Sequence, residues 1–188
     1  MCIRDRVVTE ANAAQRRFDL SGFNRISYRG TGANDRFTNN TDIDTRVVGF
    51  AGDDRITSGG GNDVVIGANG NDTIFTGDGD DYAAGNAGND TIIETEGSTG
   101  NDRLFGGPGI DEIDSGDGDD RIAGNEGNDI LRTGAGADFA FGNDGDDDIS
   151  TGSERDFVYA GLGDDLIEAG AGNDRVLGQE GNLSLIHI

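Results

Sequence analysis

A nine-residue pattern runs in register from Gly49 to Asn182 and limits the possible folds more than any other feature of the sequence. It forms fourteen complete units, interrupted once by three residues at 94–96. The sixth position is Asp and the eighth is apolar in all fourteen units, and the fourth is Gly in thirteen. A disordered polar chain would not keep three columns in register over this length. The chain is therefore predicted to stack identical structural units.

Each unit divides into a loop and a short strand. Positions one to six hold Gly, Asn and Asp, which favour turns and positive φ. Positions seven to nine form a strand whose eighth side chain points inward. One apolar residue in nine makes no core alone, but stacked coils align Ile56, Val65, Ile74 and Ile92 into interior rows. Ala83 and Ala140 are expected to be thin spots in those rows.

The loops offer only oxygen ligands, which suit a hard cation such as Ca²⁺ better than the stricter octahedron of Mg²⁺. The alternative is that each Asp only shapes a turn. The predicted metal ligands are the position-six carboxylates: Asp54, Asp63, Asp72, Asp81, Asp90, Asp102, Asp111, Asp120, Asp129, Asp138, Asp147, Asp156, Asp165 and Asp174. Backbone carbonyls of loop glycines complete the set, such as those of Gly59, Gly61, Gly77, Gly79, Gly116, Gly118, Gly170 and Gly172. Loops 106–111, 133–138 and 151–156 depart from the pattern and are expected to be weak or empty.

The units resemble GGxGxDxUx, the nonapeptide of the RTX (hemolysin-type) calcium-binding repeat family. The resemblance implies an all-β fold, a parallel β-roll that is a right-handed β-solenoid with two nonapeptides per coil. It also implies Ca²⁺ held between loops of successive coils. The match is close over 49–182 and loose over 30–48.

Alternate loops differ, which gives a period of eighteen. We call the loops that start at 49, 67, 85, 106, 124, 142 and 160 the first edge. The second edge comprises the loops that start at 58, 76, 97, 115, 133, 151 and 169, most of which open with Ser or Thr. Seven loops on each edge leave six gaps each, or twelve in all, so about ten to twelve Ca²⁺ ions are expected.

Strands that follow second-edge loops carry six of the chain's twelve aromatic residues. These residues are Tyr82, Phe105, Phe139, Phe141, Phe157 and Tyr159. One hypothesis is that this face contacts the lead-in segment, a neighbouring domain or a second copy, as large apolar patches often do. The alternative is ordinary β-propensity on an exposed sheet.

The two terminal segments do not follow the nine-residue pattern. The ends MCIRDR and LSLIHI are compatible with the two strands of one short DNA segment that looks like a sequencing adapter. We therefore expect 1–6 and 183–188 to be adapter-derived, 7–48 to be a lead-in with degenerate capping repeats, and 49–182 to be the calcium-binding roll. The only cysteine and the only histidine, Cys2 and His187, fall in these ends. We expect the rest to be a fragment of a larger protein.

Composition excludes several functions. A net charge of −23 argues against nucleic acid, and no apolar run reaches the length of a membrane span. Residues 7–182 contain no His or Cys and no nucleophile motif, so no enzyme activity is predicted there. The resemblance implies a secreted or surface bacterial protein, exported by type I secretion and folded by Ca²⁺ outside the cell. The alternatives are an accessory region of an RTX protease, lipase or polysaccharide-modifying enzyme, or an adhesin whose active domain lies elsewhere.

Overall fold

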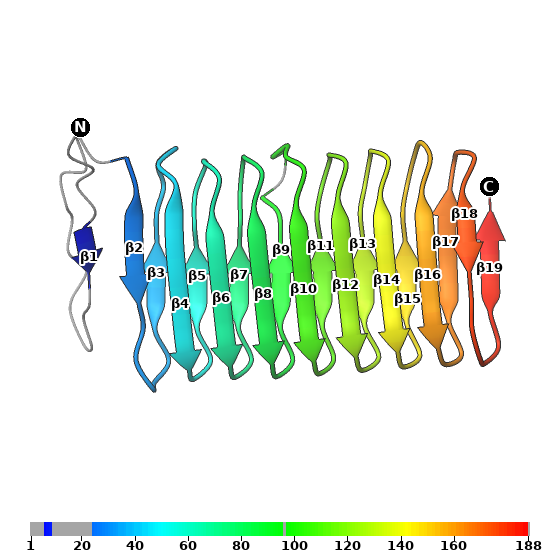
Figure 1. Ribbon diagram of the computed structural model, residues 1–188, viewed down its shortest axis with the longest axis horizontal. Coiled ribbons are helices and arrows are strands. Elements are labelled where there is room, and N and C mark those ends of the chain that lie inside the picture. Colours follow the sequence, from blue (N-terminus) through cyan, green and yellow to red (C-terminus); the bar gives the residue numbers. More distant parts are fainter. Residues whose placement is uncertain (1–5, 9–23, 96, 188) are drawn as a thin grey trace.

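The computed structural model describes residues 6–8, 24–95 and 97–187 and shows two parallel β-sheets that face each other along one long stack (Figure 1). The chain alternates between the sheets, so each coil contributes one strand to each. This arrangement confirms the predicted all-β parallel roll with two nonapeptides per coil. The ten-stranded sheet contains, in spatial order, β1 (Arg6–Val8), β2 (Ile26–Arg29), β4 (Thr45–Ala51), β6 (Val64–Asn69), β8 (Tyr82–Ala87), β10 (Arg103–Pro108), β12 (Arg121–Glu126), β14 (Phe139–Asp144), β16 (Phe157–Leu162) and β18 (Arg175–Leu177). The nine-stranded sheet contains β3 (Arg36–Thr38), β5 (Arg55–Thr57), β7 (Thr73–Phe75), β9 (Thr91–Ile93), β11 (Glu112–Asp114), β13 (Ile130–Arg132), β15 (Asp148–Ser150), β17 (Leu166–Gly170) and β19 (Ser184–His187).

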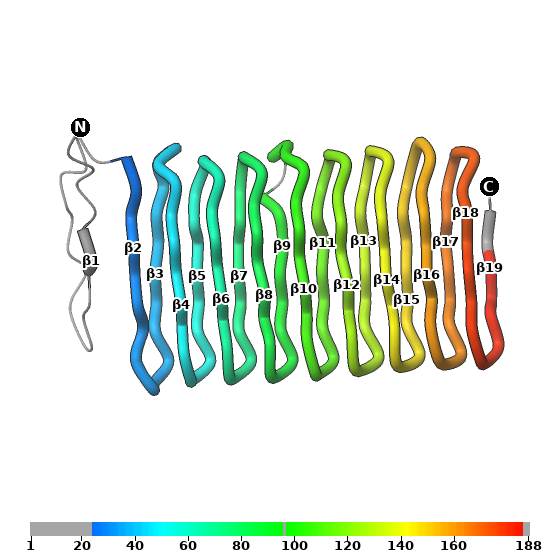
Figure 2. The backbone as a smooth tube through the Cα atoms, in the orientation of Figure 1, coloured from blue at the N-terminus to red at the C-terminus, as the bar shows by residue number. Residues whose placement is uncertain are grey.

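The strand register reproduces the eighteen-residue period. Ile122 of β12 pairs with Ala140 of β14, and the same offset holds along both sheets. Across the insertion the offset becomes 21, as in the pairing of Ala83 with Leu104. The tube in Figure 2 shows the insertion as one irregular loop at a single edge of an otherwise even stack.

The two sheets differ in strand length, which corrects the expectation of uniform three-residue strands. Strands of the nine-stranded sheet from β3 to β15 do span three residues, but β6 to β16 in the other sheet span six. The longer strands continue through the first three positions of the first-edge loops, because inter-coil pairing persists there, as between Asn125 and Asn143. Both residues have positive φ, 87° and 81°, so the strand bends without losing its partner.

The core is a double row of position-eight side chains, as predicted. From Ile56 to Ile167 every position-eight residue has an exposed fraction of 0–1%, including Ala83 and Ala140. In the lead-in, β2 buries both Ile26 and Tyr28. Tyr28 packs against Phe37 with ring centroids 5.1 Å apart, which extends the core into the lead-in.

The described parts of both terminal segments continue the sheets. In the lead-in, β2 pairs with β4 and β1 pairs with β2. At the other end, β19 lies within 183–188 and pairs with β17. Residues 9–23 of the lead-in and 1–5 of the N-terminal adapter-derived segment, with Cys2, lie outside the described residues. The four proposed segment boundaries stay predictions.

Two neighbouring isoleucines test the core assignment. Ile113 is fully buried in β11, whereas Ile110 in the preceding loop is 57% exposed. Ile113→Ala is expected to lower the free energy of unfolding by about 2–5 kcal/mol, because it leaves a cavity in a row that cannot collapse. Urea unfolding of the folded chain measures this. Ile110→Ala is the matched control and is expected to change stability little; equal losses in both variants would contradict the assignment.

Candidate metal centre

The predicted Asp residues form two rows, one along each edge of the roll. Thirteen of the fourteen are buried, with exposed fractions of 1–3%, and Asp174 at the C-terminal end is half-buried. In each, Oδ1 accepts a hydrogen bond from a backbone N–H one coil earlier, at 2.6–3.1 Å. The Asp72 carboxylate, for example, accepts from the Asp54 N–H at 2.8 Å. One oxygen of each carboxylate thus fastens successive coils together.

The second oxygen is different. In twelve of these residues Oδ2 is buried without a hydrogen-bond donor: Asp54, Asp63, Asp72, Asp81, Asp90, Asp102, Asp111, Asp120, Asp129, Asp138, Asp147 and Asp156. Such an atom is costly in a folded protein unless a proton or a cation satisfies it. The hydroxyl of Ser58 lies near Asp63, but it donates to the Thr76 carbonyl at 2.9 Å, so it does not serve the carboxylate. Rows of buried, unpartnered carboxylate oxygens fit a hard cation such as Ca²⁺.

Six of the seven first-edge loops open with Gly, and at these positions the Asp carboxylate fills the space of a side chain; the seventh opens with Ala160. A Cβ on Gly124 would lie 2.0 Å from Asp129 Oδ2, and one on Gly67 would lie 2.1 Å from Asp72 Oδ2. On the second edge the corresponding residues carry hydroxyls that are fully buried, among them Ser58, Thr76, Ser115, Thr133 and Thr151. The alternation seen in the sequence therefore gives the two edges different interior chemistry.

Loop carbonyls face the next coil, as the carbonyl-ligand prediction requires. A Cβ on Gly79 would lie 2.6 Å from the Gly61 carbonyl oxygen, and one on Gly77 would lie 2.1 Å from that of Gly59. Both glycines have positive φ, 114° and 107°. The carbonyl oxygens of Gly79, Gly116 and Gly118 similarly meet the next coil at Gly100, Gly134 and Gly136. The roles of Gly170 and Gly172, and of all these carbonyls as ligands, stay predictions.

Position five lies on the outside and has a role that the sequence did not reveal. Its Asn or Asp Oδ1 accepts from the backbone N–H of the same position one coil away, as Asn71 does from Asn89 at 2.8 Å. Ile110 and Ala137 donate into this row but offer no acceptor to the following coil. Their loops, 106–111 and 133–138, still bury a position-six Asp in the usual place.

The third irregular loop, 151–156, bends at a residue other than Gly. Glu154 takes the place of the position-four Gly and has φ of 84°, a conformation that side chains disfavour. Asp156 is nevertheless buried at 2% exposure. The weak occupancy expected for all three loops stays a prediction.

Burial shifts the acidity of the two rows. Desolvation raises the pKa of Asp72, Asp102, Asp111, Asp138 and Asp147 to about 7 and those of Asp63 and Asp120 to about 6. Asp81 reaches about 9, because burial is joined by repulsion from Asp63, Asp102 and Glu94. Without a cation, these rows therefore hold protons close to neutral pH.

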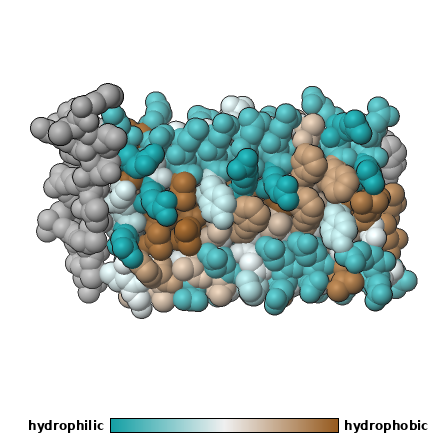
Figure 3. Space-filling model, in the orientation of Figure 1, coloured by the Kyte–Doolittle hydropathy of each residue, from teal (hydrophilic) through white to brown (hydrophobic). Residues whose placement is uncertain are grey.

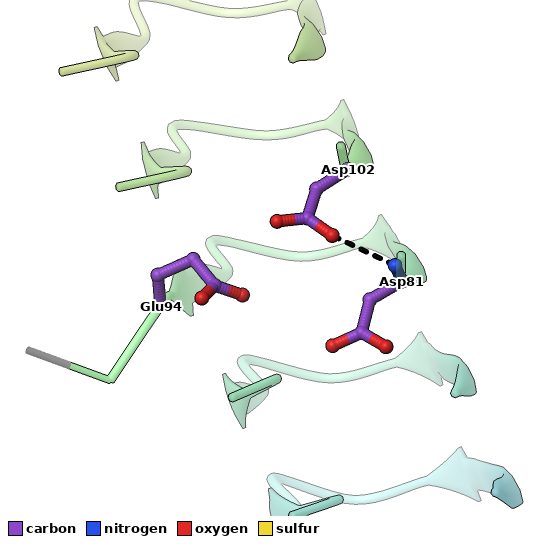
Figure 4. A group of neighbouring side chains, drawn as sticks. All are labelled: Asp81, Glu94 and Asp102. Atoms are coloured by element: carbon purple, nitrogen blue, oxygen red, sulfur yellow. Dashed lines mark hydrogen bonds between the residues drawn. The ribbon is translucent and has the colours of Figure 1, made fainter. Parts of the chain in front are cut away.

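One buried acid was missed by the sequence reasoning. Glu94 was taken as part of the insertion, but it follows Ile93 as Thr76 follows Phe75, so it occupies position one of a second-edge loop. The residues in excess are 95–97. Glu94 is 6% exposed and groups with Asp81 and Asp102, with one oxygen from each within 4.8 Å of the others (Figure 4). Counting eighteen residues from Thr76 would have assigned Glu94 to position one of the second-edge loop.

Comparison with known families agrees with this geometry. A family model for the RTX calcium-binding nonapeptide repeat, built on four copies, matches residues 29–65, 48–83, 58–92, 96–131, 123–158 and 150–182. These matches cover most of the chain from 29 to 182. A comparison with curated proteins gave no match.

The raised pKa values predict how pH affects the fold without metal. An unfolded Asp ionises near its ordinary pKa of 3.8, whereas Asp72 and Asp147 in the roll ionise near 7. Between these values the folded chain binds more protons, so its stability falls as pH rises. We expect more β-structure at pH 5 than at pH 7.5 when circular dichroism is recorded in chelator. More β-structure at pH 7.5 would contradict the assignment.

Proposed function

The chain belongs to the RTX calcium-binding nonapeptide repeat family, and from that premise we propose that it folds on binding Ca²⁺ outside the cell, as a structural module of a larger secreted or surface bacterial protein. The observation that carries this proposal is the set of twelve buried Oδ2 atoms without donors. A roll that left these atoms unpaired at neutral pH would be unstable. About ten to twelve ions between the coils would satisfy them.

Named groups of the chain would hold the ions. The Oδ2 atoms of the two Asp rows supply charge, and loop carbonyls such as those of Gly61 and Gly118 supply neutral oxygens. When bound, Ca²⁺ supplies the positive charge that the rows lack. The Asp Oδ1 atoms remain on the backbone N–H groups of the neighbouring coil and keep the loops in register. Since each position lies between two coils, binding and stacking are coupled and the transition is steep.

The charge of the chain supports folding after export. At −23, a metal-free roll repels itself, and conformational entropy favours the open chain. Calcium is scarce inside a bacterium and plentiful outside. The chain therefore stays unfolded until a type I secretion system delivers it. Among residues 6–8, 24–95 and 97–187 there is no helix of the length and hydropathy that a membrane span needs.

The repeats are a structural unit, and we propose that the chain itself performs no catalysis. Its paired acids, such as Asp119 and Asp120, have separate tasks: one fastens the exposed position-five row and the other lies in the buried position-six row. A protease, lipase, polysaccharide-modifying or adhesive domain of the same protein would lie outside this chain. The sequence that flanks it in the parent gene tests this point.

The aromatic row of the ten-stranded sheet is proposed as a contact surface. Figure 3 shows apolar side chains gathered in a band on one face, and Phe139 and Tyr82 are 47% and 39% exposed. The rings also contact one another along the sheet, as Phe139 and Phe157 do at 5.8 Å, which fits the alternative of β-propensity. Sedimentation measures the oligomeric state of the Ca²⁺-saturated chain. Self-association through this row would be weaker in the Phe139→Ser variant, whereas identical sedimentation of both chains would contradict a contact between copies here.

Calcium titration of the full chain tests the proposal directly. Far-UV circular dichroism is expected to change cooperatively from coil to β-structure as Ca²⁺ is added at neutral pH. Magnesium at equal concentration is expected to fail, because it demands a stricter octahedron and keeps its waters. A β-spectrum that chelator leaves unchanged, or disorder that persists at millimolar Ca²⁺, would contradict the proposal.

Two adjacent aspartates give a matched pair of variants. Asp120→Asn keeps an acceptor for the Asp102 N–H but removes the charge on Oδ2, so the Ca²⁺ midpoint is expected to rise on the order of tenfold, equivalent to about 1.4 kcal/mol. Asp119→Asn removes the same charge from an exposed side chain and is expected to leave the midpoint nearly unchanged. Equal shifts in both would show that net charge alone governs folding.

A further inference from the structure

Directly before the insertion, Glu94 is an acid in a column of hydroxyls. The Glu94 N–H donates to the Asp114 carbonyl at 2.9 Å, as the Thr76 N–H does to Ile93 and the Ser115 N–H does to Arg132. Glu94 thus stands between Thr76 and Ser115 in the position-one column of the second edge. All other members of this column in loops 58 to 151 are Ser or Thr. Glu94 therefore puts a carboxylate at a backbone position where the neighbouring coils have a neutral hydroxyl.

Glu94 is buried but is not neutralised by a basic group. Its Oε1 accepts a hydrogen bond from the Thr76 hydroxyl, and its Oε2 shares the single hydrogen of the Ser98 hydroxyl with the Thr95 carbonyl oxygen. The Gly77 backbone N–H also donates to this carboxylate. Within the described part of the chain, no arginine lies within ion-pair distance of this carboxylate. These neutral donors fix its direction and leave its charge uncompensated.

Two unpartnered oxygens point into the same space. Asp81 and Asp102 are 3% and 1% exposed, and the Oδ2 of each has no donor. Figure 4 shows the Glu94 carboxylate directed from the end of β9 towards both of them, with the Asp102 Oδ1 bonded to the Asp81 N–H at 2.7 Å. In the other gaps of this edge two position-six carboxylates lie beside a Ser or Thr at position one, or beside Ala169 in the last gap. This gap joins three carboxylates.

We propose that Asp81, Glu94 and Asp102 form a distinct cation site, which binds Ca²⁺ more tightly than the other gaps of the roll and prefers a trivalent lanthanide ion. The inference rests on the proposed calcium-binding function. Affinity of oxygen sites for hard cations rises with the number of charged ligands and with rigidity, and this site has three such ligands on hydrogen-bonded supports. Three negative charges match a trivalent ion, whereas two match a divalent one.

The surface beside the site offers an entry path. A hollow opens next to the insertion and is lined by Glu94, Ser98, Asp114, Gly116 and Asp117 among others. Its acidic side chains raise the local concentration of cations. Of the three carboxylates, Glu94 lines this hollow, so the site borders solvent on the Glu94 side.

Terbium titration of the Ca²⁺-folded full chain tests the site. The chain has three Tyr and no Trp, and Tyr82 directly follows Asp81, so tyrosine-sensitised Tb³⁺ emission reports on ions near this gap. The wild-type chain is expected to show one equivalent that replaces Ca²⁺ before all others. Glu94→Gln keeps the size and an acceptor for hydroxyls but removes the charge, and it is expected to weaken this first equivalent about tenfold or more. Glu126→Gln, an exposed change of equal charge, is expected to leave it intact.

The outcomes separate this inference from the proposed function. Failure of the wild-type chain to fold with Ca²⁺ would refute the proposed function itself. Folding with Ca²⁺ but without a distinct first Tb³⁺ equivalent would overturn the inference, as would a first equivalent that Glu94→Gln leaves unchanged. Should Glu94→Gln not fold, Glu94→Thr restores the hydroxyl of the column; loss of the first equivalent in that variant supports the site, and its retention overturns it.

Discussion

Like charges stacked at the spacing of β-strands are the constraint on which this structure depends. Parallel strands lie about 4.8 Å apart, so each position-six carboxylate has a neighbour at about that distance above and below. At an effective dielectric constant of about 20, such a pair repels by about 3–4 kcal/mol. The hydrogen-bond ladder through Oδ1 fixes this spacing and leaves no way to relieve it by rotation. Gly at position one of the first edge leaves space for the carboxylate oxygens. The loop carbonyls that face the next coil offer further oxygens to a cation that neutralises these carboxylates.

The hydrophobic core is too simple to impose the fold alone. One Ile, Leu or Val per strand fills the interior, and Ala83 and Ala140 reduce even that at two points. On the outer faces, arginine side chains add contacts between neighbouring strands by stacking on aromatic rings. The guanidinium of Arg121 lies 4.8 Å from the ring centroid of Phe141, and that of Arg55 lies 4.6 Å from the ring centroid of Phe75. These contacts hold strands side by side but add nothing to the interior. The polar loops therefore carry a share of the stability that most folds assign to the core.

The sequence predicted the stacked repeat, its eighteen-residue period and the Asp columns because these are periodic, and the resemblance to the RTX family supplied the parallel roll. The sequence missed what depends on hydrogen bonding between coils. In β6 to β16 of the ten-stranded sheet, backbone pairing continues through a residue with positive φ, such as Asn125. The pattern of side chains in the sequence does not indicate this pairing. Glu94 was misplaced because an insertion can be aligned before or after it, and only the pairing of β9 with β7 and β11 decides between the two.

Irregularity has a physical consequence in a repeated structure. In a stack of equal coils, stability is close to a sum over neighbours, and ordering can begin at any point. The three-residue insertion removes this equivalence at one gap near the middle of the stack, between β8 and β10. It costs loop entropy, which grows slowly with length. Beside it, Glu94 adds a buried carboxylate where neighbouring coils have a hydroxyl. Under the proposal that Asp81, Glu94 and Asp102 bind the tightest ion, this gap would be the place where the first ion and the first pair of coils assemble together.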